Sequence, residues 1–524
     1  MFKGMQGERS GELAGPDVWE TCRELIPAGS VFAFLAGHRD ALFPAGMFAD
    51  MYPSPNGRPS VPPQVLAVTV VLQALYGLPD HDAAQALRCD LRWKAACGLG
   101  LLDAGFHPSL LTYFRRRLAH SADPGRLVTR VKEVVAATGA LDGKRRRALD
   151  STVLDDAVAT QDTVTQLVAA VRRVIREVPG AAAAAASQCT AHDYRDPGKP
   201  KIAWDDEQAR AALVSALVND ALGLLGSLPA QPEGRAADAV GLLALVAGQD
   251  VEPAGGSDGT DGRWRIARRT APDRVVSVTD PDARHIHKNR TRHQDGFKAH
   301  VSFEPQAGLF TAVELTGGSG PGSHEAAVAV RLLAGENEVT VLGDTAYGTG
   351  ELRAHLRAAG HAAVIKPPPL QPAVPGGFTI SDFTIDEQSG TVTCPAGHTV
   401  TLGRPHADGT RQAQFRARCA GCPLRQRCTT SKTGRVLSVH PQHALLAAAR
   451  RRTADPAWQD EYRRWRPPVE RAIAWLVAHG NRRVPYRGIT KNNTWLHHRA
   501  AALNLRRLVN LGLTHTSHGT WALA

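Results

Sequence analysis

VTVLGDTAYG, residues 339–348, places an acidic side chain at the end of an apolar, β-branched run that favours a buried strand. Asp344 comes directly after this run, and α/β proteins commonly bind ligands at the carboxyl ends of their strands. The alternative role for Asp344 is to cap the turn that follows. RALDSTVLD, residues 147–155, predicts a second strand with Asp150 on it or at its edge, where a turn or cap role is again the alternative.

A third acidic residue lies in a predicted helix. RWRPPVERAIAWL, residues 464–476, has two prolines that favour a helix start, so Glu470 falls in the first turn. The helix dipole favours an anion there, which makes simple capping an alternative. Glu470 flanks the apolar stripe of this helix, however, and Arg466 and Arg471 beside it are suited to binding phosphate. Three carboxylates from distant segments can hold one or two Mg²⁺ ions, as in-line phosphodiester chemistry requires.

The charge balance favours a polyanionic partner. The chain has 524 residues with 62 Lys and Arg against 50 Asp and Glu, a net charge of +12. Phosphate contacts by Lys and Arg release counterions and supply affinity for nucleic acid. The alternative is a basic soluble protein from a genome rich in GC. The N-terminus lacks the apolar region of a secretory signal, and we see no run approaching a membrane span, so a cytoplasmic location, nucleoid-associated when DNA is bound, is expected.

The length predicts two or three domains, and composition shifts divide the chain further. The pattern predicts an α/β fold, in which a mixed sheet flanked by helices follows an all-α N-terminal domain and contains a small cysteine-rich insertion. The predicted parts are residues 1–60, an N-terminal extension; 61–140, a helical DNA-binding domain; 141–377, the first part of the core with a helical insertion at about 165–260; 378–440, the cysteine-rich insertion; and 441–524, the rest of the core and a basic tail.

Three predictions concern local structure. Residues 107–120 form the last of three N-terminal helices and carry Arg115, Arg116 and Arg117, which suggests a DNA-contacting domain of helix-turn-helix type. A helical bundle with a solvated basic face is the alternative. RVVSVTDPDAR, DGFKAHVSFE and LFTAVELTG, within residues 274–317, predict three successive strands. Residues 481–493 form a basic tail, followed by a final helix at 501–511.

Four cysteines gather in the segment 378–440. Cys394 heads CPAGH, and Cys419, Cys422 and Cys428 follow in CAGCPLRQRC. Four thiolates at this spacing suit a closed, tetrahedral Zn²⁺ site with a structural role, and His398 is an alternative ligand. Free thiols in an irregular insertion are the other interpretation.

The order Asp, Asp, Glu, in strand, strand and helix contexts, resembles the DDE transposases of bacterial insertion sequences. That family has an RNase H-like core related to retroviral integrases. The DTAYG segment at residues 344–348 matches its Asp-x-(Gly/Ala)-Tyr pattern, and Arg466 with Glu470 matches the Arg-x-x-x-Glu part of its Tyr-Arg-Glu-Lys signature. The N-terminal helices also resemble the transposase N-terminal domain.

Two positions depart from the signature. Tyr462 leaves three residues before the arginine where the pattern has two, and Val477 stands where the pattern has lysine. Lys491 and Arg482 are candidate substitutes for that missing cation.

The resemblance implies an enzyme that binds the terminal inverted repeats of an insertion sequence and catalyses DNA strand cleavage and strand transfer. It implies Asp150, Asp344 and Glu470 as the catalytic ligands of Mg²⁺ or Mn²⁺, two ions in all. Its partners would be double-stranded DNA, as transposon ends and target, and further copies of the chain. A metal-dependent nuclease without strand transfer and a catalytically decayed, zinc-containing DNA-binding protein are the alternatives. The candidate DNA-binding residues are Arg115, Arg116, Arg117, Tyr347, Arg466, Arg471, Arg482, Arg483, Arg487 and Lys491.

Overall fold

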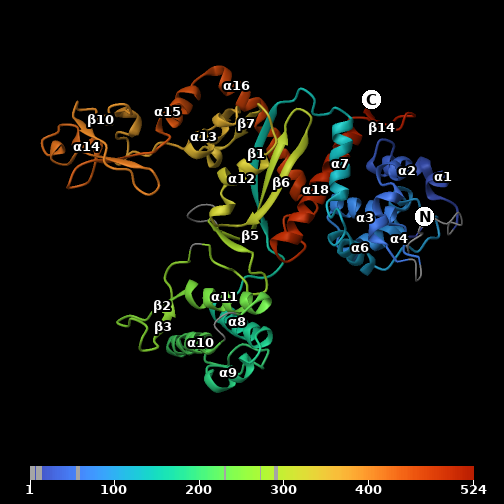
Figure 1. Cartoon of the computed structure of the whole chain (residues 1–524), viewed down its shortest axis with the longest axis horizontal. Helices are drawn as coiled ribbons and strands as arrows, with labels where there is room; N and C mark the ends of the chain where they lie inside the picture. The colour runs from blue at the N-terminus through green and yellow to red at the C-terminus, as the bar shows by residue number, and fades with distance from the viewer. Residues whose placement is uncertain (1–5, 8–14, 55–58, 229–231, 272, 288–292) are drawn as a thin grey trace.

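The computed structural model describes residues 6–7, 15–54, 59–228, 232–271, 273–287 and 293–524. Figure 1 shows a central sheet with its flanking helices, an N-terminal group of helices on one side, a cysteine-bearing module on the opposite side and a separate helical unit. The chain is therefore mixed α/β, as the sequence predicts.

The central sheet is mixed in strand direction. Its strands are β1 (Arg146–Asp155), β4 (Arg284–His287), β5 (His293–Glu304), β6 (Leu309–Gly317), β7 (Thr340–Gly343) and β8 (Ala362–Ile365). They run in the order β6–β5–β1–β7–β8, with β4 also paired to β5. β5 is antiparallel to both β1 and β6, whereas β1, β7 and β8 run parallel to one another.

Helices cover both faces of this sheet. α12 (Glu325–Leu332) and α13 (Gly350–Ala358) share a core with Leu149, whereas α17 (Pro467–Val477) and α18 (Ile489–Asn510) share the larger core with Ala148. Successive residues of a strand point to opposite faces, so β1 contributes to both cores. α16 (Pro456–Trp465) lies against β8. Two single 3-10 turns border the sheet, η3 (Pro321–Ser323) and η4 (Thr345–Tyr347).

The N-terminal helices form one packed unit that joins the core of the sheet. They are α1 (Val18–Cys22), η1 (Arg23–Leu25), α2 (Val31–Leu42), η2 (Ala45–Met51), α3 (Pro63–Tyr76), α4 (Asp80–Cys89), α5 (Leu91–Cys97), α6 (Ser109–Ala119) and α7 (Arg126–Ala137). α2 packs against α3 and α5, so the helices before residue 61 share one core with those after it. α18 lies between this unit and β6.

A helical unit with its own core interrupts the sheet between β1 and β4. It contains α8 (Thr163–Glu177), α9 (Ala181–Gln188), α10 (Glu207–Ser227), α11 (Gly234–Gln249) and the hairpin of β2 (Val251–Pro253) and β3 (Trp264–Ile266). α10 is long and apolar enough to cross a membrane by length and composition, which corrects the expectation that no segment is. Its buried residues, such as Leu217 and Leu224, pack inside the core of this unit.

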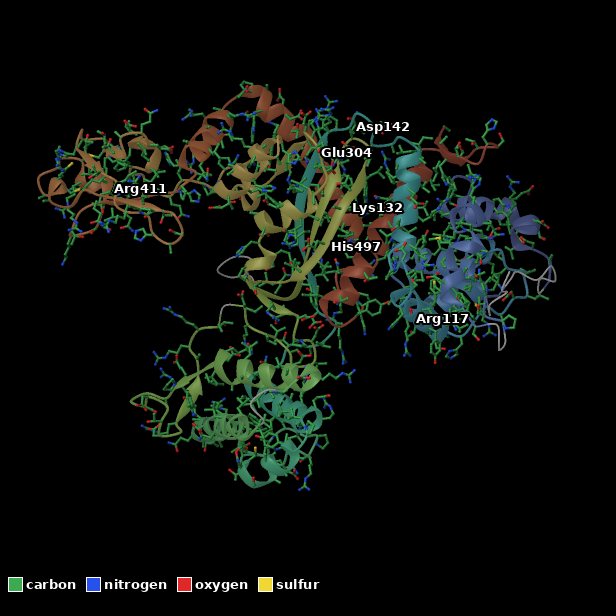
Figure 2. All side chains as sticks on the ribbon, in the orientation of Figure 1. Arg117, Lys132, Asp142, Glu304, Arg411 and His497 are labelled. Atoms are coloured by element: carbon green, nitrogen blue, oxygen red, sulfur yellow. The ribbon has the colours of Figure 1, made fainter. Side chains whose placement is uncertain are left out.

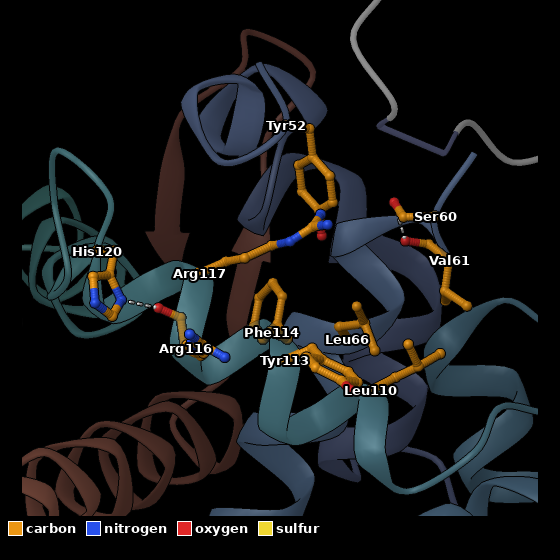
Figure 3. A pocket seen from close by; sticks show the side chains of 10 residues that line it. All are labelled: Tyr52, Ser60, Val61, Leu66, Leu110, Tyr113, Phe114, Arg116, Arg117 and His120. Atoms are coloured by element: carbon orange, nitrogen blue, oxygen red, sulfur yellow. Dashed lines mark hydrogen bonds between the residues drawn. The ribbon is translucent and has the colours of Figure 1, made fainter. Parts of the chain in front are cut away.

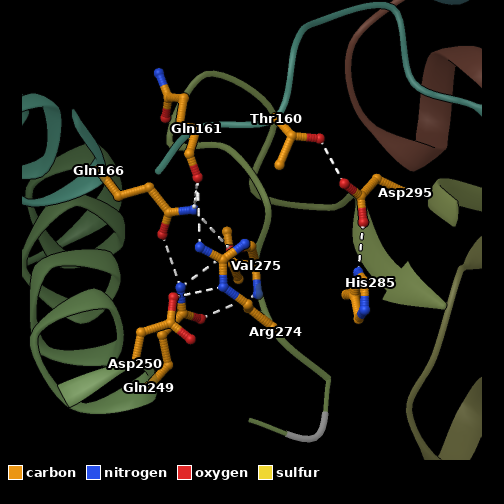
Figure 4. Close-up of polar contacts among 9 residues, drawn as sticks. All are labelled: Thr160, Gln161, Gln166, Gln249, Asp250, Arg274, Val275, His285 and Asp295. Atoms are coloured by element: carbon orange, nitrogen blue, oxygen red, sulfur yellow. Dashed lines mark hydrogen bonds and ion pairs between the residues drawn. The ribbon is translucent and has the colours of Figure 1, made fainter. Parts of the chain in front are cut away.

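Of the three strands predicted between residues 274 and 317, the prediction of the first is wrong over most of its length. β5 and β6 form as predicted, but residues 276–283 contain no strand and only β4 begins at the end of this segment. Side-chain amides replace a neighbouring strand (Figure 4): Gln249 Oε1 accepts from Val275 N at 3.0 Å, and Gln161 Oε1 accepts from Val278 N at 2.8 Å. The apolar pattern indicated that this segment is buried. Its backbone N–H groups are bonded by side chains of glutamines distant in the sequence, where a neighbouring strand would otherwise pair with them.

The last helix begins earlier than its pattern suggests. α18 starts at Ile489, inside the stretch expected to be a basic tail, and places Lys491 in its first turn. Asp280 Oδ2 accepts from Gly488 N, and Asp282 Oδ2 accepts from Ile489 N, each at 2.9 Å. Two carboxylates some 200 residues away in the sequence thus cap the helix, a partner that no local pattern reveals.

The cysteine-bearing module has a small core of its own. Its elements are η5 (Ile380–Asp382), β9 (Thr384–Asp386), β10 (Thr391–Thr393), β11 (Thr399–Thr401), β12 (Arg411–Gln414), η6 (Arg416–Cys419), α14 (Arg425–Cys428) and β13 (Val436–Val439). α15 (His443–Arg452) leads back to the sheet and packs on α13. The chain ends in the hairpin of β14 (Leu513–His515) and β15 (Trp521–Leu523).

One buried cation joins the N-terminal unit to the helix that carries Glu470. The Arg499 side chain on α18 is fully buried (0 % exposed), and burial lowers its pKa to about 10, so the guanidinium stays charged at neutral pH. It donates to carbonyl oxygens at the carboxyl ends of α3 and α17, which have no partners within their own helices. These acceptors are Ala74, Leu75, Trp475, Leu476 and Ala478.

We expect Arg499→Leu to lower the free energy of unfolding by about 3 kcal/mol or more, because several buried carbonyls would lose their only strong donor. Urea denaturation of the full chain measures this loss. Lys491→Ala, on an exposed position of the same helix, is the control and should change stability by no more than about 0.5 kcal/mol. Equal stability of the two variants would contradict the role given to Arg499.

Candidate functional site: an acidic cluster at the sheet

Strand register brings Asp150 and Asp344 together. β1 and β7 pair in parallel, with Arg146 beside Thr340 and Ala148 beside Leu342. The same register continued by two residues sets Asp150 beside Asp344, on strands that neighbour each other at about 4.8 Å. Burial raises the pKa of Asp150, and the nearby negative charge of Asp344 adds to that increase.

Arg466 links the first aspartate to the glutamate. Its guanidinium lies 3.1 Å from Asp150 Oδ2 and 3.6 Å from Glu470 Oε1. The Arg466 side chain is only 6 % exposed, whereas that of Glu470 is 67 % exposed. Arg466 stands at the junction of α16 and α17, so the helix start positions both the cation and the glutamate. Arg466 therefore holds two of the three acids around one positive charge.

Tyr462 on α16 borders all three carboxylates. Its pKa is raised, first by burial, and the charges of Asp344, Glu470 and Asp150 add to that increase while Arg466 opposes it. The pKa of Asp150 is likewise raised by burial, with Arg466 again opposing. The acids thus gather around one tyrosine ring and one guanidinium, open to solvent on the side of Glu470.

The cluster is not arranged as a closed metal site. Among the residues that the structure describes, no group of three or more His, Cys, Asp or Glu side chains is in position to hold a metal ion. Asp344 Oδ1 accepts from Ala346 N at 2.9 Å, so this carboxylate does cap its turn. Both oxygens of Asp150 have partners, since Oδ1 accepts from Ser151 N at 2.8 Å and Oδ2 lies 3.1 Å from Arg466. The second oxygen of Asp344 and the exposed Glu470 are hard donors open to a divalent cation.

A second polar group lies on the other side of β1, and the sequence did not single it out. Glu325, the first residue of α12, pairs with Lys298 at 3.0 Å and accepts from Ser151 Oγ at 3.2 Å. Tyr347 is buried between the two sides (1 % exposed), and its raised pKa reflects burial first and then the charges of Asp150, Glu325 and Asp344. Lys298 and Ser151 face the same side of the sheet, a placement that only strand register reveals.

Lys366 is the cation nearest in register to Asp344. β7 and β8 pair in parallel with Gly343 beside Ile365, so the next pair in that register is Asp344 with Lys366. Lys366 N donates to Gly343 O at 3.3 Å, and Lys366 Nζ lies 4.7 Å from the centroid of the Tyr462 ring. Lys366 is exposed. Lys366 is thus a further cation beside Asp344, and its position follows from the register of β8 beside β7 and not from spacing along the chain.

Three of the residues expected to contact DNA are engaged inside the protein. Tyr347 is buried and Arg466 is paired with the acids, so neither presents a surface to DNA in this structure. Arg115 forms an ion pair with Asp80 and lies 5.8 Å from the Tyr486 ring. Their sequence patterns are typical of exposed helix and turn residues, but contacts with distant segments bury or pair their side chains.

The neighbouring arginines do face solvent. Arg116 and Arg117 line an open pocket of about 610 Å³ in the N-terminal unit, with Tyr113 and His120 on the same helix (Figure 3). The Arg117 guanidinium lies 4.5 Å from the centroid of the Tyr52 ring. An apolar floor with exposed cations at its rim is compatible with a nucleic-acid contact.

The remaining basic candidates are exposed and lie on α17, on α18 or in the segment between them. They are Arg471, Arg482, Arg483, Arg487 and Lys491. Arg482 also donates to Thr152 Oγ1 at 2.8 Å, on the face of β1 that carries Asp150. Asp155 N–H donates to Arg482 O, and Val484 N–H donates to Asp155 O. These two backbone hydrogen bonds fix the segment beside the end of β1.

The four cysteines of the module lie near one another. Cys394, Cys419, Cys422 and Cys428 line a single small cavity together with His398. The pKa of Cys428 is raised by burial and further by the three other thiols, although Arg435 opposes the increase. Four thiols are donors that suit a tetrahedral Zn²⁺ ion. Among the described residues, these cysteines are not already in position to hold a metal.

Comparison with known protein families bears on two separate parts of the chain. Residues 20–117 match the family described as transposase domain (DUF772), and residues 393–509 match the transposase DDE domain. The second match contains Glu470 and the cysteines, and the first contains the N-terminal helices. No curated protein and no solved structure matches the chain at a significant level.

These matches define a DNA-processing enzyme. Together they indicate an insertion-sequence DDE transposase. Enzymes with a DDE domain generally use a divalent metal, usually Mg²⁺.

Proposed function

We propose that this transposase binds the terminal inverted repeats of its own element and catalyses metal-dependent DNA strand cleavage and strand transfer. The observation that carries the proposal is the gathering of Asp150, Asp344 and Glu470 around Arg466 and Tyr462. The strand order β6–β5–β1–β7–β8, antiparallel then parallel, supports an RNase H-like core. Asp150 on the central strand and Asp344 after the adjacent one then stand at the middle of that core.

The carboxylates would hold two Mg²⁺ ions, which supply activation of the attacking oxygen and stabilisation of the leaving oxygen when bound. Asp150 and Asp344 would each contribute one oxygen, that of Asp150 in place of its contact with Arg466, and Glu470 would approach from its exposed position in the first turn of α17. Arg466 opposes the increase that burial causes in the pKa of Asp150, and it lies 3.6 Å from Glu470. Water or a DNA 3′-OH would attack without any covalent link to the protein.

The DNA would extend beyond the cluster in both directions. Arg116 and Arg117 in the N-terminal unit, with the exposed arginines around residues 482–487, would bind the inverted-repeat ends. Several copies of the chain are expected to hold two ends together.

Asp150→Asn, Asp344→Asn and Glu470→Gln should each reduce strand cleavage by more than about 100-fold, because each removes a charged oxygen ligand from the metal centre. Gel-based cleavage of duplexes that carry the element ends measures the loss. Binding of the same duplexes should stay near that of the unaltered protein, which separates a chemical role from folding.

A variant among these three with full cleavage activity would remove its residue from the centre. Joined products in the same assay separate a transposase from a nuclease without strand transfer. Cleavage without any joined product, in the unaltered protein, would favour the nuclease.

We assign Lys366 to the phosphate beside the scissile bond, because its ammonium group follows Asp344 in register and lies over Tyr462 at the edge of the acids. Lys366→Ala should slow single-turnover cleavage by about 10- to 100-fold, the loss expected for one charged hydrogen bond, and Lys366→Arg should restore part of it. Lys432→Ala, an exposed lysine in the cysteine module, is the matched control. Equal rates for the two alanine variants would exclude this assignment.

We also propose that Cys394, Cys419, Cys422 and Cys428 hold one structural Zn²⁺. The purified protein should contain about one zinc per chain, and a chelator should lower the unfolding temperature, since the small module has little core of its own. Cys422→Ser should lose the metal, whereas Cys89→Ser, at an exposed thiol in α4, should retain it. Metal-free protein that unfolds at an unchanged temperature would argue for free thiols.

A further inference from the structure

The cysteine module presents a polar groove on the face of its strands opposite to its core. Side chains alternate along each strand: Val392 and Ala413 are fully buried, while their neighbours point outward. β11 joins β12 through a bridge between Leu402 and Ala413, so the two small sheets present one continuous surface. This surface lines an open groove of about 710 Å³.

The groove combines uncharged hydrogen-bonding groups with cations. Its lining residues are Thr391, Thr399, Val400, Thr401, Gly403, Arg404, His406, Gln412, Gln414 and Arg418, and none of them is acidic. Arg404 and Arg418 are exposed, and within the described part of the chain their guanidinium groups form no ion pair. By contrast, Arg425 donates to the carbonyls of Ser431 and Lys432.

The chemistry of this surface matches a nucleic-acid backbone. Hydroxyl and amide side chains donate to phosphate and sugar oxygens, and free guanidinium groups bind phosphate in pairs of hydrogen bonds. A basic partner would meet like charge in Arg404 and Arg418. The module as a whole carries eight Lys and Arg against four Asp and Glu within residues 378–440.

The groove is also connected to the acidic cluster. The module leaves the sheet after Lys366 and returns at His440, whose Nε2 lies 2.7 Å from Glu351 Oε1 on α13. Arg418 lines both the groove and the cysteine cavity, next to Cys419. Figure 2 labels Arg411 in this module and Arg117 in the N-terminal unit, at opposite ends of the molecule with the sheet between them.

We infer that the groove binds the backbone of duplex DNA on the far side of the cleavage site from the N-terminal unit. This inference rests on the proposed function and adds a second DNA surface to it. Two sources share this chemistry, the donor DNA that flanks the element end and the target DNA. The contact is to phosphate and sugar, so it is independent of sequence.

Binding of full-length protein to fluorescent duplexes over a range of salt concentrations tests the inference. In the double variant Arg404→Gln, Arg418→Gln, the negative slope of log K against log salt should become shallower by about two, one per lost phosphate contact. Lys432→Gln removes a charge from the same module outside the groove and should leave the slope unchanged. Thr401→Glu, which adds a negative charge inside the groove, should weaken binding as the double variant does.

The two DNA sources are separated by substrate. If the groove holds flanking DNA, the double variant binds normally to ends cut flush at the inverted repeat and weakly to ends with a long flank. If it holds target DNA, end cleavage stays normal and joined products fall. An unchanged slope on every duplex, or an equal effect of Lys432→Gln, would overturn the inference.

Failure of this inference is distinguishable from failure of the proposed function. The binding slopes involve no chemistry and are read in the same way with Asp344→Asn protein. Cleavage by that aspartate variant would count against the proposed function and leave the groove result standing.

Discussion

The position of Glu470 depends on a buried guanidinium at the opposite end of its helix. Arg499 donates to carbonyl oxygens at the ends of both α3 and α17, so the N-terminal unit and the helix that carries Glu470 share one donor. The contact is reinforced where the chain turns after α17: a Cβ at Gly77 would lie 2.4 Å from His479 O, and Gly77 has a φ of +66°. Only glycine allows this approach.

The acidic cluster combines two kinds of placement with different physical origins. Asp150 and Asp344 are fixed by strand register, which backbone hydrogen bonds define within a fraction of a residue. Glu470 comes from a helix terminus and remains exposed, held only by Arg466 at 3.6 Å. The first two carboxylates are thus held by the sheet, while the third is exposed and less constrained.

Much of this arrangement was predictable from the sequence because the decisive segments are local. The runs before Asp344 and around Asp150 predicted strands, and the paired prolines before Glu470 predicted the helix start, as β7, β1 and α17 show. The order of acids then led to the transposase family, which two matches confirm. The assignment of catalytic and metal-binding roles to these acids remains a prediction.

What the sequence could not reveal were contacts between distant segments. Gln161 and Gln249 replaced a strand partner for residues 275–278, and Asp282 capped α18 across the molecule. The burial of Tyr347 and the ion pair of Arg115 with Asp80 also arise from contacts between distant segments. Lys366 joined the cluster only through the register of β8 beside β7.

The helical unit and the cysteine module each leave and rejoin the core next to residues that are hydrogen-bonded within it. Asp155, just before the helical unit, is opposite Gly296, just after it, and the cysteine module is bounded by β8 and by His440 bound to α13. The length and structure of what lies between such anchors have no geometric effect on the carboxylates. Guest domains can therefore be exchanged or enlarged during evolution while the chemistry of the host stays the same.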